Sequence, residues 1–188
     1  MLAETLTDSG YSAYRTSLFS LLDVPVSASA LEIHKQISEC FPATRLMQLS
    51  EDGVVAPVER DLVNPLRTLK TRIERDLALT IEESDRLFRI AHVHALADAV
   101  FGEPAKAKRW LSKSKERFGG LAPMHLLTTQ HGANMVEGML LRISLGLAFE
   151  KTAKTTPFHE HCALNKRTYG YEDLLNENHS NRNNRISQ

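Results

Sequence analysis

The sequence predicts an all-α protein, and the stretch from Val100 to Gly146 predicts it most clearly. Pro104 and Pro123 stand where helices begin, since the missing N–H of proline costs nothing in a first turn. Gly119-Gly120 interrupts the chain between these two starts. From Gln130 onwards, apolar residues recur at helical spacing up to Gly146, where a glycine cap is expected: Ala133, Val136, Leu140 and Ile143.

Composition is that of a small protein with enough apolar residues for one core or two small ones. The chain has 188 residues, of which 42% are apolar, and its 23 basic residues balance its 23 acidic ones. This balance argues against nucleic-acid binding through bulk charge but leaves a local basic face open. Cys40 and Cys162 lie far apart without metal-like spacing, which is typical of a reduced cytoplasmic protein. No signal peptide and no membrane span is predicted.

The first thirty residues are weakly patterned, and we expect residues 1–30 to form a weakly structured leader. Leu18, Phe19, Leu21 and Leu22 suggest one short apolar turn, followed by a link at Val24-Pro25. Either loose docking on the remainder of the protein or disorder fits this pattern.

Residues 31–79 predict a group of short helices. Helices are expected over residues 31–39, from Phe41-Pro42 to about residue 51, over 54–61 and over 66–76, with a tight turn at Asn64-Pro65. In the last helix Leu66, Leu69 and Ile73 face inward together. The opposite face carries polar and basic side chains: Arg67, Thr68, Lys70, Thr71, Arg72 and Arg75.

Two short helices joined by a tight turn have the shape of a helix-turn-helix, whose second helix enters the major groove of DNA. Arginine pairs with guanine edges, and lysine or threonine holds phosphates. The predicted DNA-binding residues are therefore the six on the basic face. A solvated basic face with no ligand explains the same pattern, and the residues alone leave both interpretations open.

A long helix is predicted over residues 81–101. Thr80 and Glu83 form a capping box at its start. One side carries the predicted core residues Leu87, Ile90, Ala91, His94, Ala97 and Val100. His92 and His94 stand two apart, and hence on different faces, so they are predicted as interface histidines and not as metal ligands.

After residue 130, one glycine lies inside a predicted helix, and a histidine and cysteine cluster raises the possibility of a metal site. Gly138 lies inside a predicted helix, where glycine is unfavourable by about 1 kcal/mol relative to alanine. It either permits close helix approach or is merely tolerated. His159, His161 and Cys162 lack a fourth ligand at suitable spacing, so no metal site is predicted. Residues 150–188 are expected to be a largely disordered C-terminal extension.

The order of the motifs resembles the toxin-binding domain of Xre/MbcA/ParS-type antitoxins. The resemblance covers about a quarter of the chain at fixed spacing. It rests on Phe101-Gly102, Ala107, Trp110-Leu111, Gly119-Gly120, Pro123, Leu126-Leu127, Gly132-Ala133, Val136-Glu137, Leu140, Arg142-Ile143 and Gly146. In the preceding part, the segment EESDRLFRIAHV resembles the family's connecting helix, and RTLKTR at residues 67–72 resembles a segment of its Xre-like half.

The resemblance implies an antitoxin of a toxin–antitoxin module. Its partner would be a RES-type, NAD-consuming toxin, whose active site it occludes, and it would repress its own operon by binding operator DNA. It implies an Xre-like domain over residues 31–79, a connecting helix over 80–100 and a toxin-binding domain over 101–149. It also implies a homodimer or a larger hetero-oligomer with the toxin, and no cofactor. The residues that it assigns to toxin binding are Leu121, Pro123, Leu126, Arg142, Ser144, Gly146 and Leu147.

One residue departs from the family pattern. Val63 stands where the family has the glycine of the turn, four residues before Arg67. A β-branched residue tolerates positive φ poorly, so we expect a remodelled turn, with Asn64 as the candidate.

Two alternatives to the antitoxin stay open: a stand-alone helix-turn-helix regulator with a helical dimerisation domain, and an interaction protein that has lost DNA binding. No phosphate-binding glycine loop, nucleophile elbow or carboxylate pair is recognised, so an enzyme is not predicted.

Overall fold

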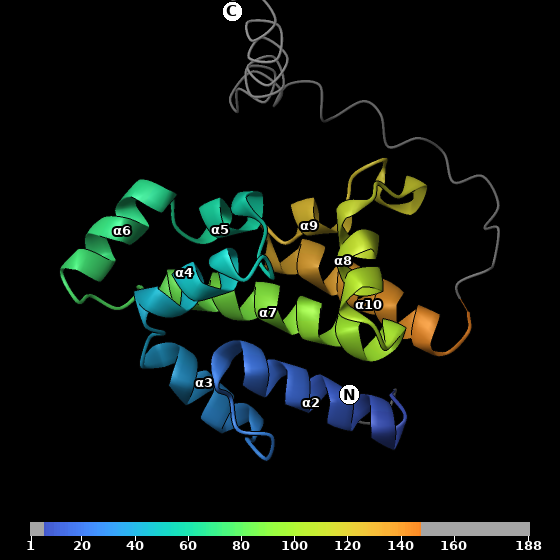
Figure 1. Ribbon diagram of the computed structural model, residues 1–188. Coiled ribbons are helices and arrows are strands. Elements are labelled where there is room, and N and C mark those ends of the chain that lie inside the picture. Colours follow the sequence, from blue (N-terminus) through green and yellow to red (C-terminus); the bar gives the residue numbers. More distant parts are fainter. Residues whose placement is uncertain (1–5, 148–188) are drawn as a thin grey trace, which may run out of the picture. The chain divides into compact units, whose positions relative to one another are not determined.

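A computed structural model of the chain describes residues 6–147, and these belong to one compact unit. The prediction of an all-α fold is confirmed, because every regular element in this range is a helix (Figure 1). The elements are α2 (Asp8–Leu22), α3 (Ala30–Ser38), α4 (Ala43–Glu51), α5 (Pro57–Val63), α6 (Leu66–Glu74), α7 (Ile81–Phe101), α8 (Pro104–Ser112), the 3₁₀ helix η1 (Glu116–Phe118), α9 (Pro123–Leu126) and α10 (Gln130–Ser144).

The long helix α7 begins and ends at the residues that the sequence predicts. Thr80 Oγ1 accepts from the backbone N–H of Glu83 at 3.2 Å, and Glu83 Oε2 accepts from the N–H of Thr80 at 2.7 Å. At the other end Gly102 has φ = 65°, and its N–H donates to Asp98 O at 2.8 Å. Local capping therefore sets both ends of this helix.

Helix α7 is the centre of the fold, since it packs against α2, α3, α5, α8 and α10 (Figure 1). The predicted core residues Leu87, Ile90, Ala91, His94 and Ala97 are buried, while Val100 is half-buried. Burial extends further round the helix than one stripe, to Val93, Ala95 and Leu96. A helix covered on several sides buries most of its circumference, so a single-stripe pattern underestimates its core.

Helix α2 corrects the expectation of a weakly structured leader over residues 1–30. Residues 8–22 form a 15-residue helix, and Thr7 caps its start by accepting from the N–H of Gly10. Leu18 is fully buried against the core, and Arg15 is buried and donates to the carbonyls of Pro25, Val26 and Ala28, each at 2.8 Å. Contacts with α7, which a local pattern does not reveal, supply the stability of this helix.

A polar contact on the flank of α7 connects α2 with α10. The hydroxyl of Tyr14 lies 2.8 Å from His92 Nδ1, and His92 Nε2 lies 3.6 Å from Glu137 Oε2. Burial raises the pKa of Tyr14 to about 12, so this hydroxyl stays neutral at physiological pH. His92 lowers the pKa of the Glu137 carboxyl. His92 is thus an interface histidine, as predicted.

The short helices between α3 and α7 pack through α4, which contacts both α5 and α6. Leu46 of α4 and Leu69 of α6 are fully buried. The helix expected over residues 54–61 begins at Pro57 instead, because proline takes the first helical position. The backbone N–H of Leu79 donates to Phe41 O at 2.9 Å and ties the segment before α7 to the start of α4.

At the C-terminal side α9 packs on both α8 and α10. The closest approach is at Gly132, where a Cβ atom would lie 2.0 Å from Leu126 O. Nothing lies within 4 Å of a Cβ placed at Gly138. Gly132 therefore permits close helix approach within the chain, whereas no described residue approaches Gly138, whose predicted alternatives, a contact between copies or mere tolerance, both stay open.

Candidate functional site

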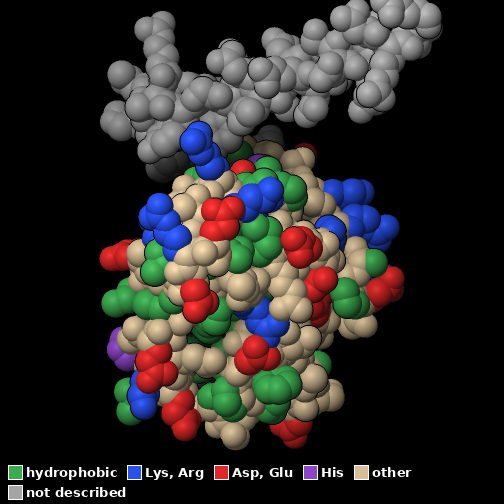
Figure 2. Space-filling view, turned by 60° about the vertical axis from the view of Figure 1, so that its left-hand side comes forward, with side chains coloured by type: hydrophobic (Ala, Val, Ile, Leu, Met, Phe, Trp, Pro, Cys, Tyr) green, Lys and Arg blue, Asp and Glu red, His purple; other side chains and the backbone are tan. Residues whose placement is uncertain are grey.

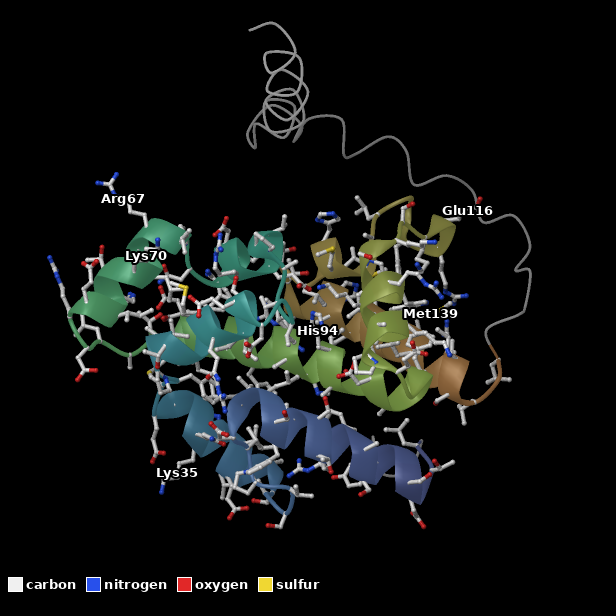
Figure 3. The ribbon with its side chains drawn as sticks, viewed as in Figure 1. Lys35, Arg67, Lys70, His94, Glu116 and Met139 are labelled. Atoms are coloured by element: carbon white, nitrogen blue, oxygen red, sulfur yellow. The ribbon has the colours of Figure 1, made fainter. Side chains whose placement is uncertain are left out.

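Helix α6 carries the predicted basic face, and four of its six predicted residues are exposed: Arg67, Thr68, Lys70 and Arg75. Figure 3 shows Arg67 at the outer side of α6, pointing away from α7. None of the three cations forms an ion pair with another described residue. These side chains are free to meet an anionic ligand.

The other two predicted residues of α6 have intramolecular partners. Arg72 Nη2 lies 3.3 Å from Glu83 Oε1, and Arg72 Nη1 donates to Ala78 O at 3.2 Å. The hydroxyl of Thr71 donates back to Arg67 O at 3.1 Å. Arg72 therefore faces the start of α7, whereas Arg67 faces solvent.

The turn between α5 and α6 needs no left-handed residue. Val63 is the last residue of α5 and is buried, so the position of the family's glycine is helical here. Asn64 is extended, with φ = −154° and ψ = 126°, and Pro65 occupies the N-cap position of α6 without a side-chain capping bond. Neither Val63 nor Asn64 therefore needs a positive φ in this turn, and the predicted strain at a β-branched residue does not arise.

Charge on the α6 side of the molecule is mixed. The face shown in Figure 2 carries basic, acidic and apolar side chains intermixed over its surface. This agrees with the equal numbers of basic and acidic residues in the chain. Any anion recognition on this side depends on a few positioned cations and not on a broad positive field.

The predicted toxin-binding residues near α9 differ in exposure. Leu121 is 50% exposed, Leu126 is half-buried against the core, and Pro123 is buried at the first position of α9. Pro123 and Leu126 therefore support the fold of this region, and Leu121 is the member of the group that offers an apolar surface.

The end of α10 is a capped helix terminus with exposed side chains. Gly146 has φ = 73°, and its N–H donates to Ile143 O at 3.0 Å, while the N–H of Leu147 donates to Arg142 O at 2.9 Å. This pair of bonds is a Schellman motif, and it confirms the predicted glycine cap. Arg142 and Ser144 are exposed, and Leu147 is 61% exposed.

The structure places Leu126 and Gly146, one from each predicted group, far apart. Gly132, beside Leu126, and Gly146 stand at opposite ends of α10, about 20 Å apart along a helix that rises about 1.5 Å per residue. Two further exposed apolar side chains were not singled out from the sequence: Met135 of α10, which is 42% exposed, and the C-cap residue Leu145, which is 54% exposed. The apolar residues on both sides of the capping Gly146 could have predicted that Leu145 is exposed together with Leu147.

A buried pair connects α5 to α7. His94 Nε2 lies 2.9 Å from Glu59 Oε1, and Glu59 Oε2 accepts from the N–H of Ala56 at 2.8 Å. The two residues are 7% and 1% exposed. Figure 3 shows His94 at the centre of the molecule, as an interface histidine should be.

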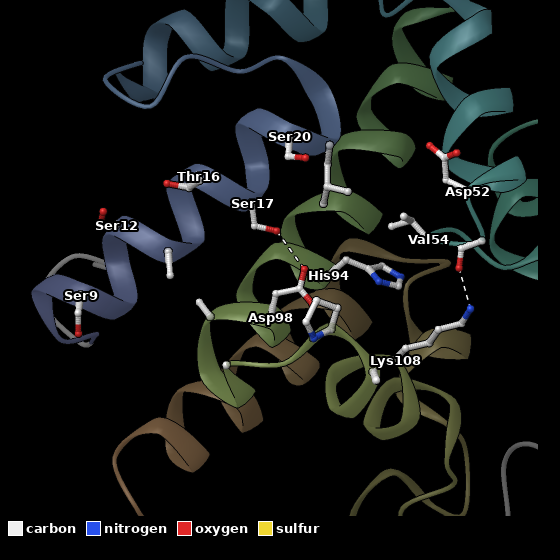
Figure 4. Close-up of a pocket in the computed structure, with 17 residues that line it drawn as sticks. Ser9, Ser12, Thr16, Ser17, Ser20, Asp52, Val54, His94, Asp98 and Lys108 are labelled. Atoms are coloured by element: carbon white, nitrogen blue, oxygen red, sulfur yellow. Dashed lines mark hydrogen bonds between the residues drawn. The ribbon is translucent and has the colours of Figure 1, made fainter.

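A groove of about 940 Å³ runs between α2, α7 and α8 (Figure 4). Hydroxyl groups of α2 line one wall, and Asp98 and His94 of α7 line the other. Ser17 donates to Asp98 Oδ2 at 3.0 Å, and Lys108 donates to Gly53 O at 2.7 Å. Burial raises the pKa of the Asp98 carboxyl. These partners are all within the protein, so the groove shows no feature that selects a ligand.

Two predicted absences concern the described part of the chain. Between residues 6 and 147 no helix is long and apolar enough to cross a membrane. The same residues contain no cluster of three potential metal ligands. His159, His161, Cys162 and the predicted C-terminal extension lie outside the described residues.

Comparison with known proteins identifies the family. Residues 96–146 match the family described as the antitoxin Xre/MbcA/ParS C-terminal toxin-binding domain. The chain is also 62% identical over 146 residues to the antitoxin Xre of Pseudomonas putida, an alignment that covers 78% of this chain and 92% of that protein. This chain therefore belongs to the Xre/MbcA/ParS family of antitoxins, which are toxin-binding regulators and not enzymes.

Proposed function

We propose that the chain neutralises a RES-type, NAD-consuming toxin by occluding its active site with the C-terminal end of α10. The observation that carries this proposal is the exposed end of that helix within the family's toxin-binding domain. Leu145 and Leu147 offer apolar area there, and Arg142 offers a cation. Apolar side chains at the centre of an interface, beside a guanidinium that can pair with a carboxylate at its rim, are suited to cover a pocket.

Leu147→Asp tests this proposal. A carboxylate in the centre of an apolar interface is costly to desolvate, so we expect at least a tenfold loss of affinity for the toxin. Leu31→Asp is the matched control, since Leu31 is 76% exposed on α3, far along the chain from α10. The measurement is the affinity of the purified chain for the product of the neighbouring gene. Equal affinities for both variants would contradict the placement of the interface.

We propose that the same chain binds operator DNA through α5 and α6, within an Xre-like domain over residues 31–79. The support is the exposed basic side of α6, with Arg67, Lys70 and Arg75 unpaired among the described residues. We assign residues 80–100 to the connecting helix and residues 101–149 to toxin binding. A homodimer, or a larger complex with the toxin, would present two copies of α6 to a palindromic site in the cytoplasm.

A shift of the upstream promoter fragment tests the DNA-binding proposal. Arg67→Ala combined with Lys70→Ala removes two phosphate contacts, so we expect the slope of log K against log salt to become about 1.8 less steep. The control is Lys35→Ala combined with Lys106→Ala, which removes the same charge from α3 and α8. An equal loss of binding in both double variants would show that only net charge matters, and it would contradict the assignment of Arg67 and Lys70 as DNA contacts.

A further inference from the structure

One carboxylate joins three segments around the predicted DNA-reading helix. Glu83 Oε2 accepts from the backbone N–H of Thr80 at 2.7 Å and so caps α7. Glu83 Oε1 accepts from Asn64 Nδ2 at 2.7 Å and lies 3.3 Å from Arg72 Nη2. The start of α7, the α5–α6 turn and the last turn of α6 therefore meet at the side chain of Glu83.

This contact is partly shielded from water. Asn64 is 1% exposed, and the side chains of Arg72 and Glu83 are 24% and 15% exposed. Arg72 is also held from its other side, because its Nη1 donates to Ala78 O and its backbone carbonyl accepts from the N–H of Leu77 at 2.9 Å. Charged hydrogen bonds in such surroundings fix side-chain geometry more firmly than those at the surface.

The same network also has a cost in stability. Among the described residues, neither Arg72 Nε nor Asn64 Oδ1 has a hydrogen-bond partner, although both atoms are buried. A buried ion pair contributes little net stability even when fully satisfied, and unsatisfied atoms lower that contribution further. We therefore interpret the contacts among Arg72, Glu83 and Asn64 as fixing the direction of α6, because they add little to the stability of the fold.

A second carboxylate holds α5 on α7 independently. Glu59 caps α5 through the N–H of Ala56 and contacts His94 of α7. Loss of the Glu83 contact therefore leaves the Glu59–His94 contact of α5 intact and removes a polar contact that fixes the direction of α6, whose Leu69 stays buried in the core. A substitution at Glu83 or Arg72 therefore tests the position of α6 without changing the contact that holds α5 on α7.

We propose that Arg72 and Glu83 are positioning residues for DNA recognition. Arg72 does not contact DNA; its pairing with Glu83 orients α6 so that Arg67 and Lys70 reach the phosphates. The inference rests on the proposed DNA-binding function and deepens it, because it divides the basic residues of α6 into those that meet the ligand and one that orients the helix.

A double-mutant cycle on the full chain tests this division. The variants are Arg72→Ala, Glu83→Gln and their combination, and the probe is the upstream promoter fragment at several salt concentrations. We expect each single variant to weaken binding by about tenfold and the double variant to weaken it by no more than either single variant. The variants lower the fraction of free chain in which α6 is oriented for binding, but the bound complex keeps the same phosphate contacts. The slope of log K against log salt should therefore stay at the wild-type value, whereas Arg67→Ala should make it about 0.9 less steep.

Controls separate this outcome from unfolding and from failure of the proposed function. Glu82→Gln changes the neighbouring acid of the same helical turn and should bind like the wild type. Thermal melts of all variants should agree with the wild type within about 4 °C, as expected for a change of up to about 1 kcal/mol. A slope that falls in Arg72→Ala, or effects that multiply in the double variant, would make Arg72 a DNA contact and overturn the inference. A wild-type chain that does not shift the fragment refutes DNA binding itself, and the positioning role with it.

Discussion

Gly132 stands in the first turn of α10, where the backbone of α9 leaves no room for a side chain. A Cβ atom there would lie 2.0 Å from Leu126 O, 2.9 Å from Leu126 C and 3.1 Å from Leu126 Cβ. Since Cβ atoms in folded proteins keep at least 3.0 Å from such neighbours, Gly132→Ala must separate α9 from α10 by about 1 Å. The neighbour is backbone, so no flexible side chain can yield.

The expected cost follows from this displacement. Overpacking of a well-packed site destabilises by about 1–3 kcal/mol. Leu126 O also accepts from the N–H of Thr129 at 3.4 Å, and this weak bond would be strained. Alanine recovers at most about 1 kcal/mol of helix propensity near a helix start. After this gain is subtracted, we expect Gly132→Ala to lower the free energy of unfolding by up to about 2 kcal/mol relative to the wild type, and by about 1–3 kcal/mol relative to an alanine substitution in the same helix that meets no neighbour.

Gly138→Ala is the matched control, because it makes the same chemical change in the same helix. Nothing lies within 4 Å of a Cβ at Gly138, so we expect a gain of about 0.5–1 kcal/mol. The assay is urea unfolding followed by far-ultraviolet circular dichroism. If Gly132→Ala proved as stable as Gly138→Ala, α9 would not lie against α10 as described, and this account of the toxin-binding domain would fail.

Two further predictions concern polar groups around α7. Tyr14→Phe removes the hydroxyl that lies 2.8 Å from His92, so we expect a loss of about 1 kcal/mol in urea unfolding, with Tyr11→Phe unchanged as the control. Burial raises the pKa of Asp98, so ionisation of this carboxyl costs stability in the folded state. Asp98→Asn should therefore be more stable than the wild type at pH 7, and the gain should disappear as pH falls below about 4. A gain that grows at low pH would contradict this sign.

Local signals predicted the ends of α7 and α10. The reciprocal bonds of Thr80 and Glu83, and the glycines at positions 102 and 146, involve residues only a few positions apart. Because such caps depend on residues only a few positions apart, they can be predicted from the sequence. The same holds for the exposed side of α6, where helical periodicity alone separates Arg67 from Leu69.

Long-range packing set what the sequence did not reveal. Helix α2 is rich in serine and tyrosine over its first half, and its burial depends on α7 and on the three carbonyls that Arg15 contacts. The partner of Arg72 is Glu83, eleven residues later in another helix. Leu126 and Gly146 share a predicted role, but only the path of α10 shows that they lie near its opposite ends.

The central claim is that the end of α10 covers the active site of an NAD-consuming toxin. The most direct measurement is the rate of NAD consumption by the purified product of the neighbouring gene, titrated with this chain. We predict that inhibition rises with binding and becomes complete at saturation, and that Leu147→Asp requires at least tenfold more protein while Leu31→Asp does not. Unchanged NAD consumption in a saturated complex, or equal potency of the two variants, would contradict the claim.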